Sequence, residues 1–285
     1  MENKKIIYVL SILIMLLVFA ASLIGVLSNE IHVHPNVITA FDEEIELYQK
    51  GLYHRDSVSM ATQAIAQDIV TLIIGIPMAL ISLFLINKEN KKGIFLLTGI
   101  IGYFLYTYTS YSFLAFFNSF YLVYLAIMAL SFYDFILCIC ELNRYRLKDE
   151  FSDKFPQKGL SIFLYITGIV IGLIWLGRII PAIINNSAPV GLEHYSTLAI
   201  QTLDLGVVVP ACFVTGYLLR KGKQMGYLFS IVLVIKAVTM TAAVSAMAIS
   251  MKLHAVEVSC VEFVVFPTIF CICTFFMIRI LRQVQ

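Results

Sequence analysis

The chain has 285 residues, of which 60% are apolar and only 13% are charged. A soluble domain cannot bury so much apolar surface, because its own surface must be covered by polar groups. The composition therefore excludes a soluble enzyme or binding domain and indicates an integral membrane protein. The net charge of +2 gives no sign of a nucleic-acid partner, and we expect none.

Apolar stretches long enough to cross a bilayer recur along the whole chain. A transmembrane helix needs about 20 predominantly apolar residues. The sequence predicts such spans at 6–27, 62–86, 93–116, 119–140, 159–183, 197–219, 226–250 and 257–281. The first span is longer than the core of a signal peptide and lacks a good small-residue cleavage site, so we expect it to be retained. The predicted fold is an all-α integral membrane protein with eight transmembrane helices.

The basic residues of the connecting segments sort to one side of this arrangement. One side holds fifteen lysines and arginines, whereas the other holds only three, Lys50, Arg55 and Lys252. Cytoplasmic loops of membrane proteins carry the excess of basic residues. Both termini are therefore expected in the cytoplasm.

The longest polar segment, 28–61, joins the first two spans on the expected outer side. Thr39 followed three residues later by Asp42 resembles a capping box. Apolar residues then recur at helical spacing: Phe41, Ile45, Tyr48 and Leu52. This pattern predicts a short amphipathic helix that lies over the outer face of the bundle.

The two halves of the chain share a weak repeat. The sequence Gly-Leu-Tyr-His at 51–54 is echoed by Gly-Leu-Glu-His at 191–194. In each half a span with an acidic residue and a proline follows, and then a basic turn that ends in glycine. These residues are Asp68, Pro77 and Gly93 in the first half and Asp204, Pro210 and Gly226 in the second.

This repeat predicts two parallel four-helix units. The first, 1–158, includes the outer loop 28–61, and the second, 159–285, carries most of the buried charges. Parallel repeats recur among transporters. Superposing the first four spans on the last four should place Asp68 near Asp204 and Tyr103 near Lys236, by a rotation about the membrane normal.

Several short sequences are similar to those of a known group of proteins. They are Gly-Leu-Tyr at 51–53, Asp-Ser at 56–57, Gln-Asp-Ile-Val-Thr-Leu at 67–72, Gly-Tyr-Phe-Leu-Tyr at 102–106 and Trp-Leu-Gly-Arg at 175–178. In these segments the chain resembles a group of uncharacterised prokaryotic multi-pass membrane proteins. The resemblance implies a multi-pass protein of the prokaryotic plasma membrane. It implies no particular activity.

Ionisable residues occur inside the predicted spans, where each costs at least about 2.5 kcal/mol and so needs a reason. At about 1.5 Å per residue, four of them lie on the order of 10 Å below the outer surface, and a lysine lies near the midplane. The four are Asp68, Arg178, Asp204 and Glu262, and the lysine is Lys236.

With Gln67, Gln201 and Tyr103, these five charged residues predict a polar cavity that binds a solute or an ion. The acids Asp68, Asp204 and Glu262 are candidate cation or proton sites. Arg178 and Lys236 are candidate counter-charges or anion ligands. The alternative is that the charges pair only to hold the bundle together, although such pairs seldom stabilise a protein more than apolar packing does.

All five histidines lie in the predicted outer loops. His32 and His34 could share a divalent metal if their segment is extended, because residues i and i+2 then lie on one face. The alternative is that they are ordinary surface histidines, and we predict no metal and no other cofactor. The six cysteines lie in or at the edges of apolar spans, where they act as small apolar side chains.

These features favour a secondary transporter or permease that handles a small polar or ionic solute, with proton coupling as an option. No nucleotide-binding or hydrolase motif occurs in the sequence, which argues against ATP-driven transport by this chain alone. The expected partners are the lipid bilayer and a small solute or proton. Two alternatives stay open: a membrane sensor or assembly protein, and an intramembrane enzyme that acts on a lipid or quinone.

Overall fold

The computed structural model describes residues 3–145, 147, 151, 155–258 and 260–284, with only the backbone described for 260–262. Within these residues, eight helices are long and apolar enough to cross a membrane. Their bounds are Lys4–Leu27 (α1), Val58–Asn87 (α2, η2 and α3), Lys92–Leu114 (α4), Tyr121–Asn143 (α5), Gln157–Asn185 (α7), Ala199–Arg220 (α8, η3 and α9), Gln224–Leu253 (α10) and Phe263–Gln283 in α11 (Cys260–Gln283). The prediction of eight spans is confirmed at the level of helix length and composition.

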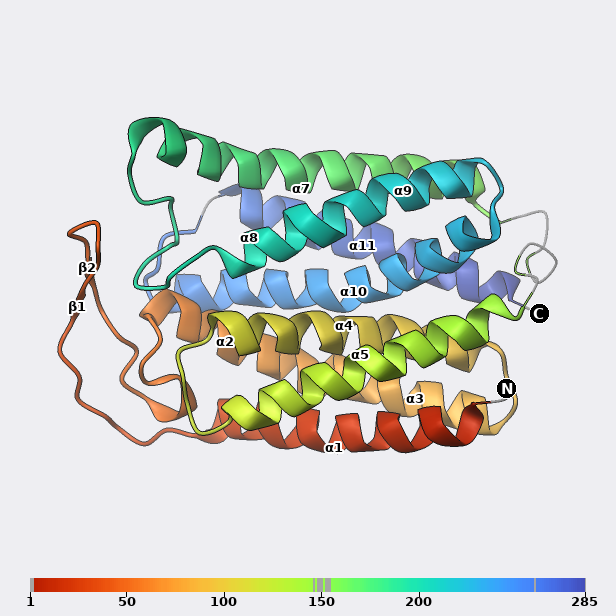
Figure 1. The fold of residues 1–285 in the computed structure, drawn as a ribbon, viewed down its shortest axis with the longest axis horizontal. Coiled ribbons are helices and arrows are strands. Elements are labelled where there is room, and N and C mark those ends of the chain that lie inside the picture. Colours follow the sequence, from red (N-terminus) through yellow and green to blue (C-terminus); the bar gives the residue numbers. More distant parts are fainter. Residues whose placement is uncertain (1–2, 146, 148–150, 152–154, 259, 285) are drawn as a thin grey trace.

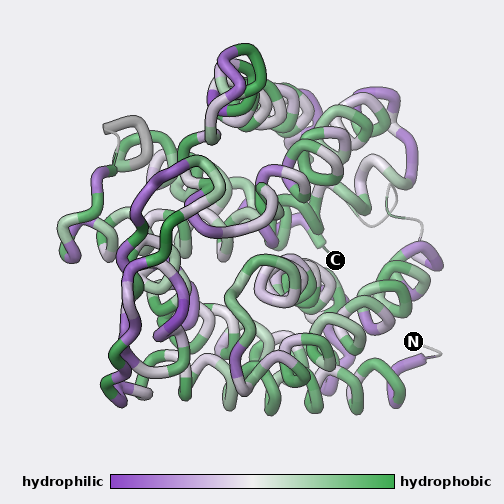
Figure 2. Tube along the Cα trace, turned by 60° about the vertical axis from the view of Figure 1, so that its left-hand side comes forward, coloured by the Kyte–Doolittle hydropathy of each residue, from purple (hydrophilic) through white to green (hydrophobic). Residues whose placement is uncertain are grey.

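The helices run side by side along one axis, and both chain ends lie at the same end of the bundle (Figure 1). We call this end the terminal end and the opposite one, which carries β1 and β2, the hairpin end. Hydrophobic residues dominate the helices, whereas hydrophilic residues gather mostly at helix ends and in the connections (Figure 2). Large apolar side chains such as Leu16, Leu122 and Leu173 are exposed on the bundle surface, as expected for a face in contact with lipid.

Two spans contain a π-helical turn in the middle. In the second span α2 (Val58–Val70) leads into η2 (Thr71–Gly75) and α3 (Ile76–Asn87). In the sixth span α8 (Ala199–Leu203) leads into η3 (Asp204–Val208) and α9 (Val209–Arg220). Pro77 and Pro210 each stand at the second position of the helix that follows the π turn. Because proline has no N–H and its ring clashes with the carbonyl four residues earlier, the helix widens there instead of continuing in regular α form.

Helices α4 and α10 lie at the centre of the bundle. Helix α4 packs against α3, α5, α8 and α10, and α10 packs against α9, α11, α2 and α4. Gly99 allows the close approach of these two helices, because a Cβ at this position would lie only 2.4 Å from the Cβ of Ile235. The two helices thus have corresponding neighbours in the two halves of the chain. The contacts of α4 with α3, α5 and α8 match those of α10 with α9, α11 and α2.

The segment before α2 differs from the prediction. The expected amphipathic helix is wrong, because the structure has a small hairpin of β1 (Val37–Ile38) and β2 (Glu44–Ile45), followed by a 3-10 turn, η1 (Gly51–Tyr53). The hydroxyl of Thr39 does accept backbone N–H bonds, from Phe41 and Glu43, but it closes the tight turn of the hairpin. Asp42, Gln49 and Gly51 have positive φ angles, which a right-handed helix cannot include.

The two halves differ in how their outer helices pack. Helix α1 packs along α5. Over the described residues, α7 and α11 approach each other only locally, for example where the rings of Phe163 and Phe276 meet with centroids 5.3 Å apart. The space that is filled in the first half therefore stays open in the second.

Candidate functional site

This open space is a cavity of about 730 Å³ between α2, α4, α7, α8–η3–α9, α10 and α11. Apolar side chains form most of its wall, among them Ile171, Ile174, Met240 and Val244. Charged and amide side chains interrupt this wall: Gln63, Gln67, Arg178, Glu193, Gln201, Asp204, Lys236 and Glu257. A concave, largely apolar space with a few convergent polar groups is the usual form of a small-molecule site.

Asp204 is the acidic group at the centre of this site. It is the first residue of the π turn η3. Its Oδ1 accepts a hydrogen bond from the hydroxyl of Tyr106 on α4 (2.7 Å), and its Oδ2 accepts one from Nε1 of Trp175 on α7 (2.8 Å). Two uncharged donors from two other spans thus hold both carboxylate oxygens.

Lys236 faces the same cavity from α10. Its Nζ lies 3.8 Å from the centroid of the Tyr106 ring, which is a cation–π contact. Its charge interacts with that of Asp204, yet within the described part of the chain it forms no direct ion pair. Tyr106 therefore links the two groups, with its ring under the ammonium and its hydroxyl on the carboxylate. Lys236 is half-buried, and it lines the cavity inside the bundle.

Arg178 follows Trp175 by one helical turn on α7. Its guanidinium carbon lies 5.3 Å from the centroid of the Trp175 ring. The indole thus contacts Arg178 through its face and Asp204 through its N–H. Arg178, Asp204 and Lys236 are brought together on the cavity wall, as the sequence predicted.

Asp68 lies elsewhere, although it was expected in the same site. Its side chain is only 1% exposed and does not line the cavity. It accepts hydrogen bonds from the hydroxyls of Tyr53 (2.6 Å) and Tyr111 (3.4 Å), and it fills the space beside Gly25 of α1. The neighbouring Gln67 does line the cavity, because successive residues of a helix point about 100° apart.

The other predicted residues occupy different places. Tyr103 is fully buried behind the cavity wall, where its hydroxyl is hydrogen-bonded to Gln67 (2.8 Å) and Thr71 (2.7 Å). The side chain of Glu262 lies outside the described residues. His32 and His34 lie at the hairpin end, in the loop between α1 and α2.

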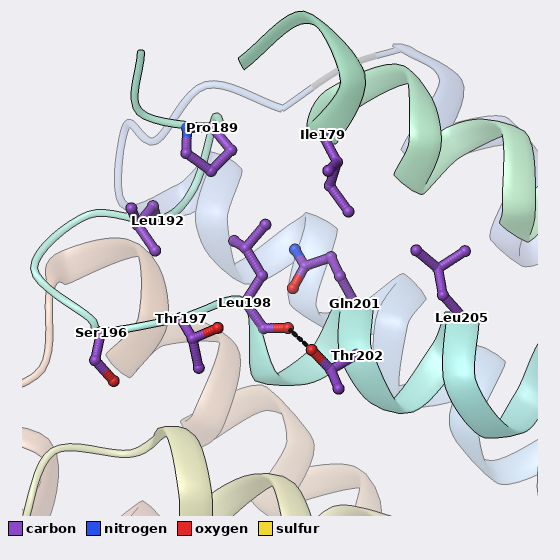
Figure 3. Close-up of a pocket in the computed structure, with 9 residues that line it drawn as sticks. All are labelled: Ile179, Pro189, Leu192, Ser196, Thr197, Leu198, Gln201, Thr202 and Leu205. Atoms are coloured by element: carbon purple, nitrogen blue, oxygen red, sulfur yellow. Dashed lines mark hydrogen bonds between the residues drawn. The ribbon is translucent and has the colours of Figure 1, made fainter. Parts of the chain in front are cut away.

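Gln201 lines the cavity and also a second, shallower hollow of about 360 Å³. Figure 3 shows it among the apolar side chains of Ile179, Leu198 and Leu205. No charged residue of the described chain lines this second hollow. We therefore place the functional site in the larger cavity.

The connection 186–198 between α7 and α8 bounds the cavity at the hairpin end, where Glu193 and Tyr195 line it. This connection is held to the first half of the chain. The Tyr195 hydroxyl donates to Oδ1 of Asp56 (2.8 Å), which also accepts the N–H of Phe116 (2.9 Å), and the Ser57 hydroxyl donates to Glu193. Burial raises the pKa of Asp56 to about 6, although its hydrogen bonds oppose this rise, and burial also raises the pKa of Glu193.

Tyr106 and Trp175 are residues of the candidate site that the sequence analysis missed. Tyr106 belongs to a tyrosine-rich stretch that is typical of an aromatic belt at the membrane interface. A helical signal was nevertheless present, because Tyr106 follows Tyr103 by three residues and Trp175 precedes Arg178 by three. Residues at this spacing lie on the same face of a helix.

The site must be interpreted from its own chemistry. That chemistry is a fixed carboxylate, a lysine held over an aromatic ring and an arginine beside an indole, all on the wall of a largely apolar cavity. Comparison of the chain with protein families, with curated proteins and with solved structures finds no match to any of them.

Proposed function

We propose that this protein is a secondary transporter that carries a small organic anion together with a proton across the prokaryotic plasma membrane. The observation that carries the proposal is the charged wall of the cavity, where Lys236 is held close to Asp204 by Tyr106 without a direct ion pair. The ammonium group has three N–H donors, and its contact with the Tyr106 ring uses none of them as a conventional hydrogen bond.

The balance of donors and acceptors favours an anion over a cation. Each oxygen of Asp204 already accepts one hydrogen bond from a neutral donor, whereas the ammonium group of Lys236 has no hydrogen-bond acceptor among the described residues. Lys236 can still donate to an incoming carboxylate. The apolar wall around Ile171, Ile174 and Val244 suits the hydrocarbon part of such an anion. The volume of about 730 Å³ lies in the usual range for small-molecule sites.

Proton coupling follows from the link between Lys236 and Asp204. When Asp204 is ionised, its negative charge offsets that of Lys236 and weakens the attraction of the site for an anion. Protonation of Asp204 removes this competition. Anion and proton therefore bind more strongly together than either does alone, which is the requirement for symport.

The architecture suits transport better than sensing alone. The cavity follows α10 from Met251 to Leu233, about 27 Å at 1.5 Å per residue, against a hydrocarbon core of about 30 Å. Spans interrupted in mid-membrane are frequent in transporters. Both π turns precede a proline, and Gly93 and Gly226 follow these prolines at equal spacing, which supports two parallel four-helix repeats. The basic residues gather at the terminal end, so we assign this end to the cytoplasm.

The test is uptake of labelled organic anions into liposomes that contain the purified protein. Short-chain and aromatic monocarboxylates serve as probes, with protein-free liposomes as the control for passive entry. An acidic exterior should accelerate uptake by the wild type. Lys236→Met should abolish this uptake, and Asp204→Asn should make it independent of the pH gradient. The proposal is rejected if the folded protein moves none of these anions under either direction of the gradient.

A second candidate, an intramembrane enzyme that acts on a lipid, is favoured by one observation. The described parts of α7 and α11 both line the cavity but pack together only locally, which suits lateral entry of an acyl chain. This candidate predicts that reconstituted protein converts a bilayer lipid into a product detectable by mass spectrometry. Lys236→Met should prevent that conversion. Such a product without anion uptake would favour the enzyme.

A further inference from the structure

Three histidines, two of them neighbours in sequence and the third twenty residues further on, gather in the loop between α1 and α2. His32 and His34 lie on the extended chain that leaves α1, and His54 follows the turn η1. One ring nitrogen from each of the three lies within 4.8 Å of the others. Nε2 of His34 and Nδ1 of His54 are only 2.7 Å apart, and the ring centroids of His32 and His54 are separated by 3.9 Å.

The distances match a site for a transition-metal ion. Zinc binds imidazole nitrogen at about 2.0–2.1 Å, so the ligand atoms of a tetrahedral site are about 3.3 Å apart. The observed distances, 2.7 Å between His34 and His54 and at most 4.8 Å within the group, lie on both sides of this separation. Three protein ligands with a fourth position open to water is a common arrangement for zinc.

The backbone around the histidines holds them in this arrangement. The N–H of His32 donates to the carbonyl of Gln49 (2.9 Å), and the N–H of Gln49 donates to the carbonyl of His54 (3.1 Å). The Gln49 side chain also donates to the carbonyl of His34 (3.3 Å). Each histidine is thus tied through its own main chain to Gln49.

The chain reversal between the two segments needs special residues. Gln49 and Gly51 have φ angles of 62° and 56°, in the left-handed region. A Cβ on Gly51 would lie 2.1 Å from the carbonyl oxygen of Ser28, so only glycine fits there. The N–H of Gly51 donates to the carbonyl of Glu30 (2.9 Å). These contacts align the extended segment that carries His32 and His34 with the turn before His54.

We propose that His32, His34 and His54 bind one divalent transition-metal ion, with Zn²⁺ the ion that fits best. Neutral imidazole nitrogens select Zn²⁺, Cu²⁺ and Ni²⁺ over Ca²⁺ and Mg²⁺, which prefer oxygen ligands. The inference is independent of the proposed transport. It departs from the expectation of no metal, which rested on His32 and His34 without His54.

A bound ion stabilises the end of the bundle next to the cavity. His54 follows Tyr53, whose hydroxyl donates to the buried Asp68 (2.6 Å). It precedes Asp56, which holds Tyr195 at the cavity wall. Cross-linking His54 to the extended segment of His32 and His34 therefore restrains both contacts. We expect the ion to rigidify the hairpin end of the cavity.

The test is calorimetric titration of Zn²⁺ into the full-length protein, purified in detergent and treated with a chelator. We expect one ion per chain with a Kd at or below about 1 µM, and no comparable binding of Mg²⁺. Replacing His32, His34 or His54 by alanine should weaken binding at least tenfold. His254→Ala is the matched control, because this histidine also lies at the hairpin end but outside the cluster. This variant should bind Zn²⁺ as tightly as the wild type does.

Limited proteolysis provides a second readout that does not depend on heat of binding. Zn²⁺ should protect the segment 28–57 in the wild type and in His254→Ala, but not in His54→Ala or in the milder variant His54→Gln. Equal melting temperatures without metal identify the variants that are folded. The proposal is overturned if the wild type takes up no stoichiometric Zn²⁺, or if His254→Ala weakens binding as much as the cluster variants do.

Discussion

Removal of the Tyr106 hydroxyl tests the centre of the candidate site. Tyr106→Phe deletes the donor that lies 2.7 Å from Oδ1 of Asp204 and leaves the ring under Lys236 in place. A hydrogen bond to a charged group contributes about 1.5–3 kcal/mol, so the free energy of unfolding should fall by that amount. Tyr106→Leu also removes the cation–π contact, worth about 2 kcal/mol when desolvated, and should cost about 3.5–5 kcal/mol in total.

The assay is reversible unfolding in mixed detergent micelles, followed by helical circular dichroism. Tyr121→Phe is the matched control, because Tyr121 is 37% exposed at the start of α5, and its loss of a hydroxyl should change stability by less than about 0.5 kcal/mol. If Tyr106→Phe has as small an effect as this control, the hydrogen bond from the Tyr106 hydroxyl to the Asp204 carboxylate does not stabilise the fold. The described link between Lys236 and Asp204 would then be incorrect.

Three further predictions concern other parts of the molecule. Because burial raises the pKa of Asp56 to about 6 from an ordinary value of 3.8, the folded state binds a proton more tightly than the unfolded state, and stability should fall as pH rises from about 4 through 6. The full loss is about 3 kcal/mol, of which about 1.4 kcal/mol falls between pH 5 and pH 8, and Asp56→Asn should remove this difference between the stabilities measured by thermal melting at the two pH values. Gly99→Val should disrupt the contact of α4 with α10 and sharply reduce the yield of folded protein, whereas Gly177→Ala, where a Cβ meets nothing within 4 Å, should leave the yield unchanged. In a background without native cysteines, an impermeant thiol reagent should label Glu44→Cys in intact cells but not Lys91→Cys, and the reverse result would invert the proposed orientation.

The eight spans could be predicted because a stretch of about 20 apolar residues is long enough to cross the bilayer as a helix. The same physics identified Arg178, Asp204 and Lys236, since an ionisable group in hydrocarbon needs partners. The depth of a residue in the membrane follows from its position in the sequence. The direction of its side chain depends on how the helix is rotated about its own axis, which is set by packing. The prediction therefore grouped Asp68 with the cavity, although Gln67 faces the cavity and Asp68 fills the space beside Gly25.

The loop 28–57 shows where periodicity misleads. Its apolar residues recur at helical spacing, but residues with positive φ, such as Asp42 and Gln49, reverse the chain instead. A left-handed conformation in a residue other than glycine leaves little trace in composition. For the same reason the approach of His54 to His32 and His34 could not be foreseen. It depends on backbone hydrogen bonds through Gln49.

The uptake rate of a variant with a filled cavity tests most directly whether this cavity is the route of an anion. Val244 lines the cavity on α10, and Val244→Trp places an indole in its apolar part. Val214→Trp is the matched control, because Val214 is 57% exposed on the lipid-facing surface of α9. With organic monocarboxylates and an acidic exterior, we predict rapid uptake by the wild type and by Val214→Trp, and uptake near that of protein-free liposomes for folded Val244→Trp. Equal rates for the two tryptophan variants would contradict the assignment of the cavity as the transport site.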